Sequence, residues 1–262
     1  MNREERLSSI LDLLGSADSV QVAEIVDTFG VSPATARRDL DVLASRQLLN
    51  RTRGGATAIS VAYDLPLRYK REQHADAKQR IAAKVMDLVP PGARVGLTGG
   101  STCTTIASEL GQRADLVGRT TAESLTVVTN AVNIAAQLVI RPHIRVVMTG
   151  GVIHARSYEL VGPYSDLMLE RITLDLAFVG INGFDVLNGP MVHDDREARV
   201  NGLMASRAER AWLVADSSKV GHRAFASIGR LDMFYGLVTD NGISARDRRE
   251  ITDAGLQVLV AD

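Results

Sequence analysis

The chain has 262 residues, of which 45% are apolar, and its 30 Lys and Arg against 31 Asp and Glu give a formal net charge of −1. This apolar content is ample for a packed core, and no apolar run reaches the ~18 residues of a membrane-spanning helix. One cysteine excludes an internal disulfide, and five histidines at no metal-ligand spacing argue against a structural zinc or iron site. The charged first residues lack the apolar core of a secretory signal. We therefore expect a cytoplasmic protein of one or two domains, without cofactor, metal or membrane partner.

Three short helices are predicted near the start of the chain. Apolar residues recur at helical spacing from Leu7 to Leu14 and again from Val22 to Phe29. Gly30 is placed to cap the C-terminus of the second helix. Ser32 can cap the N-terminus of a third helix, and Pro33 suits its first position, where a missing N–H costs nothing. Two amphipathic helices and a tight turn into a third are typical of a helix-turn-helix.

The third helix has an apolar face and a basic face. Ala36, Leu40 and Leu43 would be buried, which leaves two adjacent arginines on the other faces. Taken alone, an arginine pair on a helix is more often a solvated face than a nucleic-acid contact. Residues 37–53, however, hold five arginines against two aspartates, a net charge of +3. Such local clustering, rather than total charge, favours a DNA-binding surface.

A basic hairpin follows the third helix. Residues 48–49 and 56–59 are predicted strands, and Gly54-Gly55 supplies the turn between them. The result is a winged helix-turn-helix, whose last helix enters the major groove of DNA by its N-terminal half. Arginine suits this task because its fork binds guanine or phosphate through two donors. The candidate DNA contacts are Ser32, Thr35, Arg37, Arg38, Arg51 and Arg53.

Two motifs in this region carry a family resemblance. Val31 to Leu40 reads Val-Ser-Pro-Ala-Thr-Ala-Arg-Arg-Asp-Leu, and Arg51 to Ala56 reads Arg-Thr-Arg-Gly-Gly-Ala. With these motifs, residues 1–60 resemble the DNA-binding domain of the DeoR family of bacterial transcriptional regulators. We place a winged helix-turn-helix domain at 1–60, a linker at 61–77 and a second domain at 78–262.

The second domain alternates short apolar strands with helices. A helix is predicted from Lys78, and continuous Val, Leu and Ile runs separated by helices favour a mainly parallel sheet covered on both faces. The fold class is therefore α/β. The predicted strands are 94–98, 126–129, 145–149, 175–180, 211–215, 236–239 and 257–260, and the predicted helices are 104–110, 131–139, 164–171, 196–210 and 245–254.

Small and polar residues follow five of these strands, at the edge of the sheet where such folds bind ligands. Any single Gly-Gly pair is more often a tight turn, but several converging on one edge favour a small anionic ligand. The segment at 98–102 lacks the spacing of nucleotide-binding loops, which disfavours nucleoside triphosphates and dinucleotides. The candidate effector-binding residues are Gly99, Gly100, Ser101, Thr102, Asn130, Gly150, Gly151, Asn182, Glu197 and Lys219.

This domain also resembles the DeoR effector domain, which is similar in fold to ribose-5-phosphate isomerase and coenzyme A transferases. The matching stretches include residues 100–102, 127–130, 150–151 and 216–219. The resemblance implies a phosphorylated sugar or related metabolite as effector, with phosphate at 100–102, sugar hydroxyls near Asn130 and 150–151, and Lys219 as a cation.

The chain departs from the family pattern at two places. The family often has Asp-Ser before Gly-Thr-Thr, where this chain has Thr98-Gly99, and a carboxylate that could bind a sugar hydroxyl is lost. Asn201 stands where the family commonly has a lysine. In the opposite direction, residues 193–195 add acidity before the long helix, which is equally well explained as a helix N-terminus rich in carboxylates.

Three function classes compete. A sugar-phosphate isomerase with a DNA-binding appendage needs a carboxylate base beside the substrate. The isomerase pattern has an Asp-Gly-Ala-Asp-like stretch at the end of the fourth strand, where this chain reads Val179-Gly180-Ile181-Asn182, so both acidic positions are neutral and no catalytic residue is assigned. A purely architectural DNA binder would leave the second domain without a role. We therefore expect a repressor of carbohydrate-metabolism genes that binds double-stranded operator DNA as a homodimer or homotetramer and is released by its effector.

Overall fold

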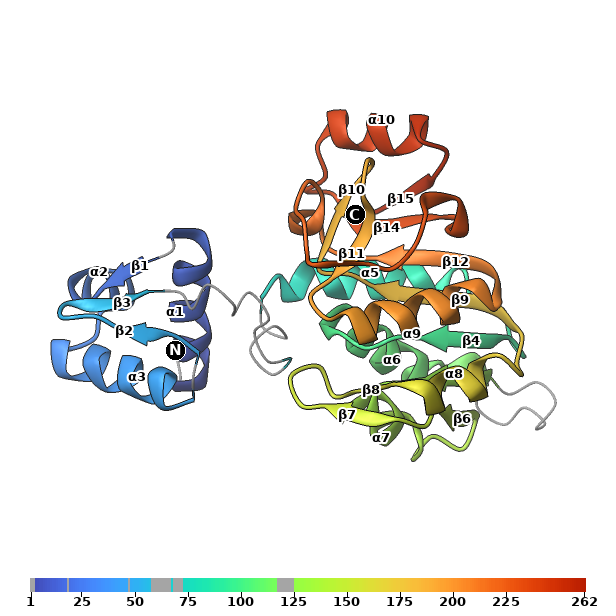
Figure 1. Cartoon of the computed structure of the whole chain (residues 1–262), viewed down its shortest axis with the longest axis horizontal. Helices are drawn as coiled ribbons and strands as arrows, with labels where there is room; N and C mark the ends of the chain where they lie inside the picture. The colour runs from blue at the N-terminus through green and yellow to red at the C-terminus, as the bar shows by residue number, and fades with distance from the viewer. Residues whose placement is uncertain (1–2, 18, 47, 58–66, 68–72, 117–124) are drawn as a thin grey trace. The chain divides into compact units, whose positions relative to one another are not determined.

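The computed structural model describes residues 3–17, 19–46, 48–57, 67, 73–116 and 125–262 (Figure 1). The chain forms two compact units, Met1–Gln73 and His74–Asp262. Most of the segment expected as a linker at 61–77, and residues 58–59 of the second predicted wing strand, lie outside the described residues.

The first unit is a small helical domain with a three-stranded antiparallel sheet in the order β1-β3-β2. Its core contains the apolar residues that recur at helical spacing in the sequence. Leu7, Ile10, Ile25 and Leu40 are fully buried. The predicted winged helix-turn-helix is therefore confirmed. Its elements are α1 (Arg3–Ala17), β1 (Ser19–Gln21), α2 (Val22–Phe29), α3 (Pro33–Ser45), β2 (Asn50–Arg51) and β3 (Gly55–Thr57).

The predicted helix caps are also confirmed. Gly30 ends α2 at φ 63°, a conformation that favours glycine. The Ser32 hydroxyl accepts the Thr35 N–H at 3.1 Å, and Pro33 follows it at the first position of α3. The turn between the two helices is thus set by three residues within four positions, Gly30, Ser32 and Pro33.

One wing prediction is wrong. Leu48 and Leu49 are not a strand, because β2 begins only at Asn50. Both leucine side chains are buried in the core, at 8% and 2% exposure. A strand would have pointed them to opposite faces, so their joint burial requires a bend before the wing.

The second unit is built on a seven-stranded sheet in the order β15-β14-β12-β9-β4-β5-β6, in which every neighbouring pair is parallel. The predicted fold class, a winged helix-turn-helix followed by a mainly parallel α/β domain, is therefore confirmed. The strands are β4 (Arg94–Leu97), β5 (Leu125–Thr129), β6 (Ile144–Met148), β9 (Leu174–Gly180), β12 (Ala208–Val214), β14 (Gly236–Asp240) and β15 (Gln257–Ala261).

Helices cover both faces of this sheet (Figure 1). Successive residues of one strand enter opposite cores: Trp212 belongs to the core under α5, α6 and α7, and Leu213 to the core under α8, α9 and α10. The helices are α5 (Ala75–Met86), α6 (Ser101–Gln112), α7 (Val132–Leu138), α8 (Pro163–Leu169), α9 (Asp195–Ser206) and α10 (Ala245–Asp253), with short 3-10 turns η1 (Ala114–Leu116), η3 (Ser217–Lys219) and η4 (Leu231–Met233).

The predicted helix at 196–210 is too long. α9 ends at Ser206, and β12 starts at Ala208 by pairing with Leu174 of β9. Side-chain charge alone did not separate the two elements, because Glu209 and Arg210 are exposed in the strand as they would be on a helix.

Short antiparallel strands beyond the main sheet were not predicted. β7 (Val152–His154) and β8 (Glu159–Val161) form a hairpin, and β10 (Gly183–Asp185) pairs with β11 (Gly189–Val192), which pairs with β13 (Ala226–Ser227). Runs of two to four residues give no usable alternation of polarity. None of the helices in the described part of the chain has the length and apolar character of a membrane span.

Candidate functional site

The exposed side of α3 carries the arginines singled out by the sequence. Arg37 and Arg38 are exposed, whereas Ala36, Leu40 and Leu43 on the opposite side are fully buried. Within the described residues neither guanidinium has a hydrogen-bond or ion-pair partner. At the start of the helix, the Ser32 and Thr35 hydroxyls lie 2.9 Å apart. The surface therefore presents two unpaired cations beside a helix N-terminus, an arrangement suited to phosphate and base edges.

The two wing arginines differ from each other. Arg51 Nε donates to Asp41 Oδ1 of α3 at 2.8 Å, and its Nη1 donates to the Gly55 carbonyl. Arg53, at the turn, is exposed and has no partner among the described residues. Arg51 thus fastens the wing to α3, while Arg53 is available to a ligand. A Cβ at Gly55 would overlap the Val20 carbonyl oxygen, so glycine is needed there for strand packing.

Asp39 positions the DNA-binding helix α3, and the sequence predictions assigned it no role. It is 1% exposed, and its carboxylate accepts from Arg6 Nε of α1 at 2.6 Å. A second arginine, Arg3, lies 3.6 Å away. The signal was present in the spacing: Asp39 lies three residues after Ala36, on the apolar side of the helix. The pair fixes α3 against α1 and so sets the direction of its arginines.

In the second unit, the candidate effector residues gather at the carboxyl edge of the sheet. The strand order reverses between β4 and β9, since β5 and β6 follow on one side of β4 while β12, β14 and β15 lie beyond β9. Loops that leave neighbouring strands at such a point diverge and form a crevice. Residues 98–102 follow β4, and Asn182 follows β9, so both flank this point.

The loop after β4 is fixed by one buried hydroxyl and by the backbone conformation of Gly100. The buried Thr98 hydroxyl accepts the Gly180 N–H at 2.9 Å, which ties the ends of β4 and β9 together. Gly100 precedes α6 at φ 104°, a conformation that favours glycine, and no side chain caps the helix there. Ser101 and Thr102 form the first turn. The N–H groups of this turn point out of the helix toward the loop.

A polar cluster surrounds the ends of β5 and β6. Asn130 is fully buried, and its Nδ2 donates to Glu159 Oε2 of β8 at 2.9 Å. Its Oδ1 is buried without a partner among the described residues, as is the Thr149 hydroxyl. Gly151, at φ 141°, lets the backbone approach β8, because a Cβ there would lie 2.7 Å from the Val161 carbonyl oxygen. Gly150 precedes it and is exposed.

Glu197, in the first turn of α9, is bound to the β7–β8 hairpin. It is 4% exposed, and its Oε1 lies 2.5 Å from His154 Nδ1 and accepts the Ser157 hydroxyl. Asp194 caps the same helix, and hydrogen bonding from the Arg196 side chain lowers the pKa of Asp194 from 3.8 to about 2. The hairpin is therefore fastened to α9 by a carboxylate that already has two partners.

Asn182 and Lys219 lie on two loops that the structure joins. The Gly221 N–H donates to the Phe184 carbonyl at 2.8 Å, between the segment after β9 and the segment after β12. Asn182 Oδ1 accepts the His193 N–H at 3.2 Å. Lys219, in η3, is half-buried, and no ion pair of its ammonium occurs within the described residues.

Comparison with known proteins identifies the family. Residues 6–62 match the DeoR-like helix-turn-helix domain, and residues 73–241 match the DeoR C terminal sensor domain. The chain is 34% identical to the HTH-type transcriptional regulator GlpR of Haloferax volcanii over 97% of this chain and 96% of that protein. This chain belongs to the DeoR family of transcriptional regulators.

Other DeoR-family relatives are similar over nearly the whole chain. The glycerol-3-phosphate regulon repressor of Escherichia coli strain K12 is 28% identical, over 98% of this chain and 99% of that one. The lactose phosphotransferase system repressor of Streptococcus mutans is 29% identical, over 92% and 93%. Among solved structures, ribose 5-phosphate isomerase A of Methanocaldococcus jannaschii overlaps 56% of this chain and 55% of that one, at a TM-score of 0.42 and 18% identity.

Two residues at the sensor-domain edge were missed by the sequence predictions. Glu159 gave no signal, since it lies in an unpredicted hairpin. Lys78 did give one, because it lies three residues before Ile81 on the buried face of α5, and it is 4% exposed. The Arg80–Asn241 hydrogen bond of 3.4 Å places this end of α5 beside the carboxyl end of β14. Lys78 is thus a buried cation in the same half of α5 as Arg80.

The single cysteine of this family member is buried beneath the same edge. Burial raises the pKa of the Cys103 thiol to about 12, and the nearby charge of Glu159 acts in the same direction. The thiol is therefore neutral and has no nucleophilic character. No group of three metal-ligating side chains occurs in the described part of the chain.

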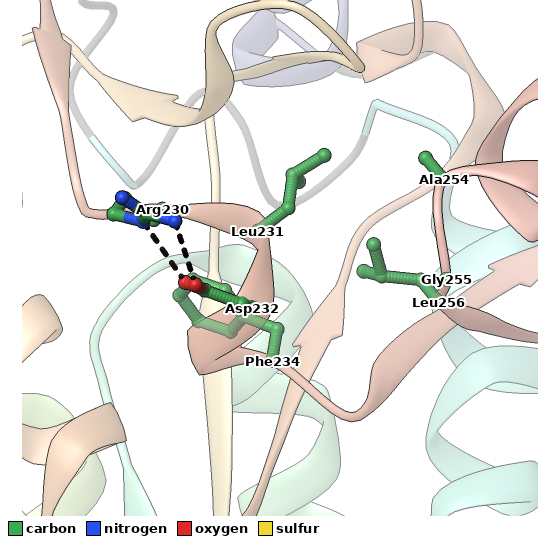
Figure 2. Close-up of a pocket in the computed structure, with 7 residues that line it drawn as sticks. All are labelled: Arg230, Leu231, Asp232, Phe234, Ala254, Gly255 and Leu256. Atoms are coloured by element: carbon green, nitrogen blue, oxygen red, sulfur yellow. Dashed lines mark hydrogen bonds and ion pairs between the residues drawn. The ribbon is translucent and has the colours of Figure 1, made fainter.

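A pocket of about 380 Å³ lies elsewhere on the sensor domain, lined by Arg230, Leu231, Asp232, Phe234, Ala254, Gly255 and Leu256. Figure 2 shows that two of these lining residues, Arg230 and Asp232, form an ion pair. Its Nη2–Oδ2 distance is 2.9 Å. These residues precede β14 and β15, so the pocket lies at the amino edge of the parallel sheet. The candidate effector residues follow the strands and lie at the opposite edge.

Proposed function

We propose that this DeoR-family regulator is a repressor of carbohydrate-metabolism genes. A phosphorylated sugar or a related metabolite causes it to dissociate from operator DNA. The names of two relatives, a glycerol-3-phosphate regulon repressor and a lactose phosphotransferase system repressor, support this direction of control and this class of genes. In this proposal, residues 1–60 bind DNA, 61–77 link the domains, and 78–262 bind the effector and join subunits.

The DNA-binding role is assigned to the exposed side of α3 and to the wing turn. Arg37, Arg38 and Arg53 are exposed cations without protein partners within the described residues, and Ser32 and Thr35 lie at the helix N-terminus beside them. Arg51 contributes by holding the wing in place. One such module makes few base contacts, so tight binding needs two half-sites and hence a homodimer or homotetramer.

The effector role rests on one observation: an uncapped helix N-terminus at the point where the strand order reverses, beside a buried amide oxygen that lacks a partner. The first turn of α6 supplies hydrogen-bond donors for a phosphate at Gly100, Ser101 and Thr102. Asn130 Oδ1 is an unpaired acceptor buried at the next strand end. A buried polar atom without a partner is rare in proteins, and a bound ligand accounts for it.

The remaining candidate residues fall into two groups. Lys219 supplies positive charge, and Gly150 and Gly151 leave backbone accessible after β6. Glu197 and Asn182 already have protein partners, so they position the surrounding loops in the absence of the effector. The effector can release the protein from DNA only if it binds the released conformation more tightly than the DNA-bound conformation. The size of the effect is limited by the ratio of these two affinities.

A sugar-phosphate isomerase is the alternative, and we propose that this chain is not one. The strand end after β9 offers Asn182 rather than an acid, and its amide oxygen already accepts a backbone N–H. Incubation of the purified chain with aldose and ketose phosphates tests the point. We expect no interconversion above background, and turnover at enzyme-like rates would contradict a purely regulatory role.

The repressor proposal is tested by selecting a binding site from a random duplex library with the full chain. Fluorescence anisotropy on the selected duplex is then measured with inorganic phosphate and with a panel of sugar phosphates. We expect tight, salt-dependent binding that at least one sugar phosphate weakens. Failure to select any duplex, or DNA binding unaffected by every sugar phosphate, would contradict the proposal.

A further inference from the structure

Two buried polar atoms without partners lie at the same level of neighbouring strands. Thr149 follows β6 and Asn130 follows β5, and the two residues are 2% and 0% exposed. Neither the Thr149 hydroxyl nor Asn130 Oδ1 has a hydrogen-bond partner among the described residues. The β5–β6 register pairs Thr129 with Met148, and the Thr149 N–H donates to the Thr129 carbonyl at 3.0 Å. Thr149 is therefore the neighbour of Asn130 where the parallel ladder ends.

The side chains of Asn130 and Thr149 point to the same face of the sheet. Val128 of β5 belongs to the apolar core under α8, α9 and α10, and Val147 of β6 packs against the same core. Asn130 and Thr149 lie two residues further along these strands, and side chains two residues apart share a face. Since neighbouring strands are about 4.8 Å apart, the two partnerless atoms come from adjacent positions on one surface.

The orientation of the Asn130 amide is fixed by its contacts with β8. Asn130 Nδ2 donates to Glu159 Oε2 at 2.9 Å, so the amide oxygen points away from this carboxylate. Glu159 itself lies against the loop after β4, since a Cβ on Gly99 would overlap its carboxylate. The Asn130 carbonyl accepts the Leu160 N–H at 2.7 Å, which adds a main-chain bond to the same strand. Asn130 therefore presents its amide oxygen in one fixed direction.

The two partnerless atoms together suit an alcohol hydroxyl. An amide oxygen only accepts hydrogen bonds, whereas a threonine hydroxyl both donates and accepts. A group between them must donate to Asn130 Oδ1 and accept the Thr149 proton. Phosphate dianion and carbonyl oxygens cannot donate, and an ammonium group would leave the Thr149 proton without an acceptor. An alcohol hydroxyl does both.

The β7–β8 hairpin lies over this part of the sheet edge, as the bonds from β8 to Asn130 show. Its strands have three residues each, and its turn contains Tyr158 at φ 63°, a backbone conformation that is uncommon for residues other than glycine. The first N–H of α7, on Val132, donates to the Tyr158 carbonyl at 3.0 Å. Few hydrogen bonds are broken when so short a hairpin opens locally. Since Asn130 and Thr149 are buried, a ligand reaches them when the hairpin moves away from the edge, and the hairpin then closes over it.

We propose that Thr149 and Asn130 bind one hydroxyl group of the effector beneath the β7–β8 hairpin, and that Thr149 is thereby a specificity-determining residue. The ligand hydroxyl donates to Asn130 Oδ1 and accepts from the Thr149 hydroxyl. This inference rests on the proposed function, because it takes the effector to be a phosphorylated metabolite bound at this edge. Sugar and polyol phosphates satisfy both atoms, whereas a phosphate ester without hydroxyls leaves both unpaired and binds more weakly.

The test compares matched ligands on the full chain by calorimetry. Each hydroxylated probe has a hydroxyl-free partner: glycerol 3-phosphate with propyl phosphate, and ribose 5-phosphate with tetrahydrofurfuryl phosphate. We expect at least one hydroxylated probe to bind roughly 10- to 100-fold more tightly than its partner, as two added hydrogen bonds allow. Thr149→Val keeps the shape of the side chain and removes the hydroxyl. In this variant the ratio falls by roughly three- to tenfold, while the affinity for the hydroxyl-free partner stays within about twofold.

Two further variants keep the test decisive. Thr149→Ser retains a hydroxyl, so its ratio stays within about twofold of wild type. Thr239→Val is the matched control, because the Thr239 hydroxyl of β14 is also buried without a partner among the described residues. Its register neighbour in β15 is Val260, and β12, β9 and β4 separate β14 from β5, so the ratio is unchanged in this variant.

Thermal unfolding of the free protein excludes a purely structural role. Because the Thr149 hydroxyl has no partner there, Thr149→Val does not lower the Tm. A lower Tm with an unchanged ligand ratio would assign the hydroxyl to a buried water and overturn this inference alone. An unchanged ratio in Thr149→Val, or equal affinities within each ligand pair in wild type, overturns it as well. Wild-type protein that binds none of these phosphates overturns the proposed function too.

Discussion

The two units of this regulator use polar side chains in opposite ways. On α3 and the wing, Arg37, Arg38 and Arg53 are exposed and unpaired within the described residues. At the carboxyl edge of the sensor sheet, Thr98, Asn130 and Glu159 are buried and bonded to each other or to the backbone. A surface that meets a polyanion needs available charge, whereas a site for a small molecule needs fixed geometry.

The contrast predicts where a substitution acts. Changes on the DNA-binding side alter affinity with little effect on folding, except where a charge is buried. Changes at the sensor edge alter both ligand binding and local structure, because each polar group there supports another.

The largest expected effect is on folding of the first unit, in Asp39→Ala. Removing one partner of a buried ion pair typically costs about 3 kcal/mol or more, since Arg6 is left without its carboxylate. Hydrogen exchange of the α3 amides in the full chain measures it. Asp41→Ala is the control, because its carboxylate is 65% exposed and its pair with Arg51 is worth at most about 1 kcal/mol. Equal exchange in the two variants would contradict the role given to Asp39.

Next comes operator affinity in Arg38→Ala. Loss of a base-reading arginine costs about 1–3 kcal/mol, or roughly 5- to 150-fold in Kd, with α3 still folded. Anisotropy on the selected duplex measures the change. Arg249→Ala, in an exposed part of α10, serves as the matched loss of positive charge. Wild-type affinity in Arg38→Ala would remove this residue from the DNA-binding surface.

A backbone effect of intermediate size is expected in Gly100→Ala. A Cβ at this position meets no atom within 4 Å, so the cost comes from φ 104° alone, about 1–3 kcal/mol. Thermal unfolding of the second unit, followed by Trp212 fluorescence, measures it. Gly99→Ala has no such backbone strain and acts through displacement of Glu159. If Gly100→Ala were as stable as wild type, the left-handed turn before α6 would not be a requirement of the site.

A smaller, selective effect is expected in Lys219→Ala. Operator binding stays within about twofold of wild type, because the change lies in the second unit, while release by the effector needs several-fold more ligand. Anisotropy titrations with and without effector separate the two quantities. Weakened operator binding together with an unchanged effector response would contradict the role of Lys219 in effector binding.

The smallest effect concerns pH. The pKa of Asp194 is about 2 in the folded protein against an ordinary value of 3.8, so its contribution to stability is complete above 3.8 and is lost as pH falls through about 2. Carboxyl chemical shifts measured by NMR report this titration. Arg196→Ala should move it back toward 3.8, and an unchanged midpoint would show that Arg196 does not hold this helix cap.

How far the sequence predicted these features follows from the range of the interactions involved. The α3 helix was predictable in detail, because the Ser32 cap, Pro33 and the apolar spacing act within one turn of helix. The seven-stranded sheet was predictable as a class, since buried parallel strands read as continuous apolar runs. The end of α9 was not, because β12 starts through pairing with β9, which is distant in the sequence.

The candidate site shows the same limit. The polar segments that follow β4, β5 and β6 could be identified from the sequence. The residues that their side chains contact could not be predicted. Glu159 reaches Gly99 and Asn130 only because the β7–β8 hairpin turns back over the sheet edge, and that hairpin has no signal in its own residues. Asp39 and Lys78 could have been found, since each is a charged residue at a buried helical position.

The central claim is that a metabolite bound at the carboxyl edge of the sensor-domain sheet controls the affinity of α3 for DNA. Its most direct test is fluorescence anisotropy of the full chain on its selected duplex, titrated with the sugar phosphate that binds most tightly by calorimetry. The account predicts release at concentrations near the calorimetric Kd in wild type, and release shifted to several-fold higher concentration in Lys219→Ala. Binding of that sugar phosphate without any change in DNA affinity would contradict it.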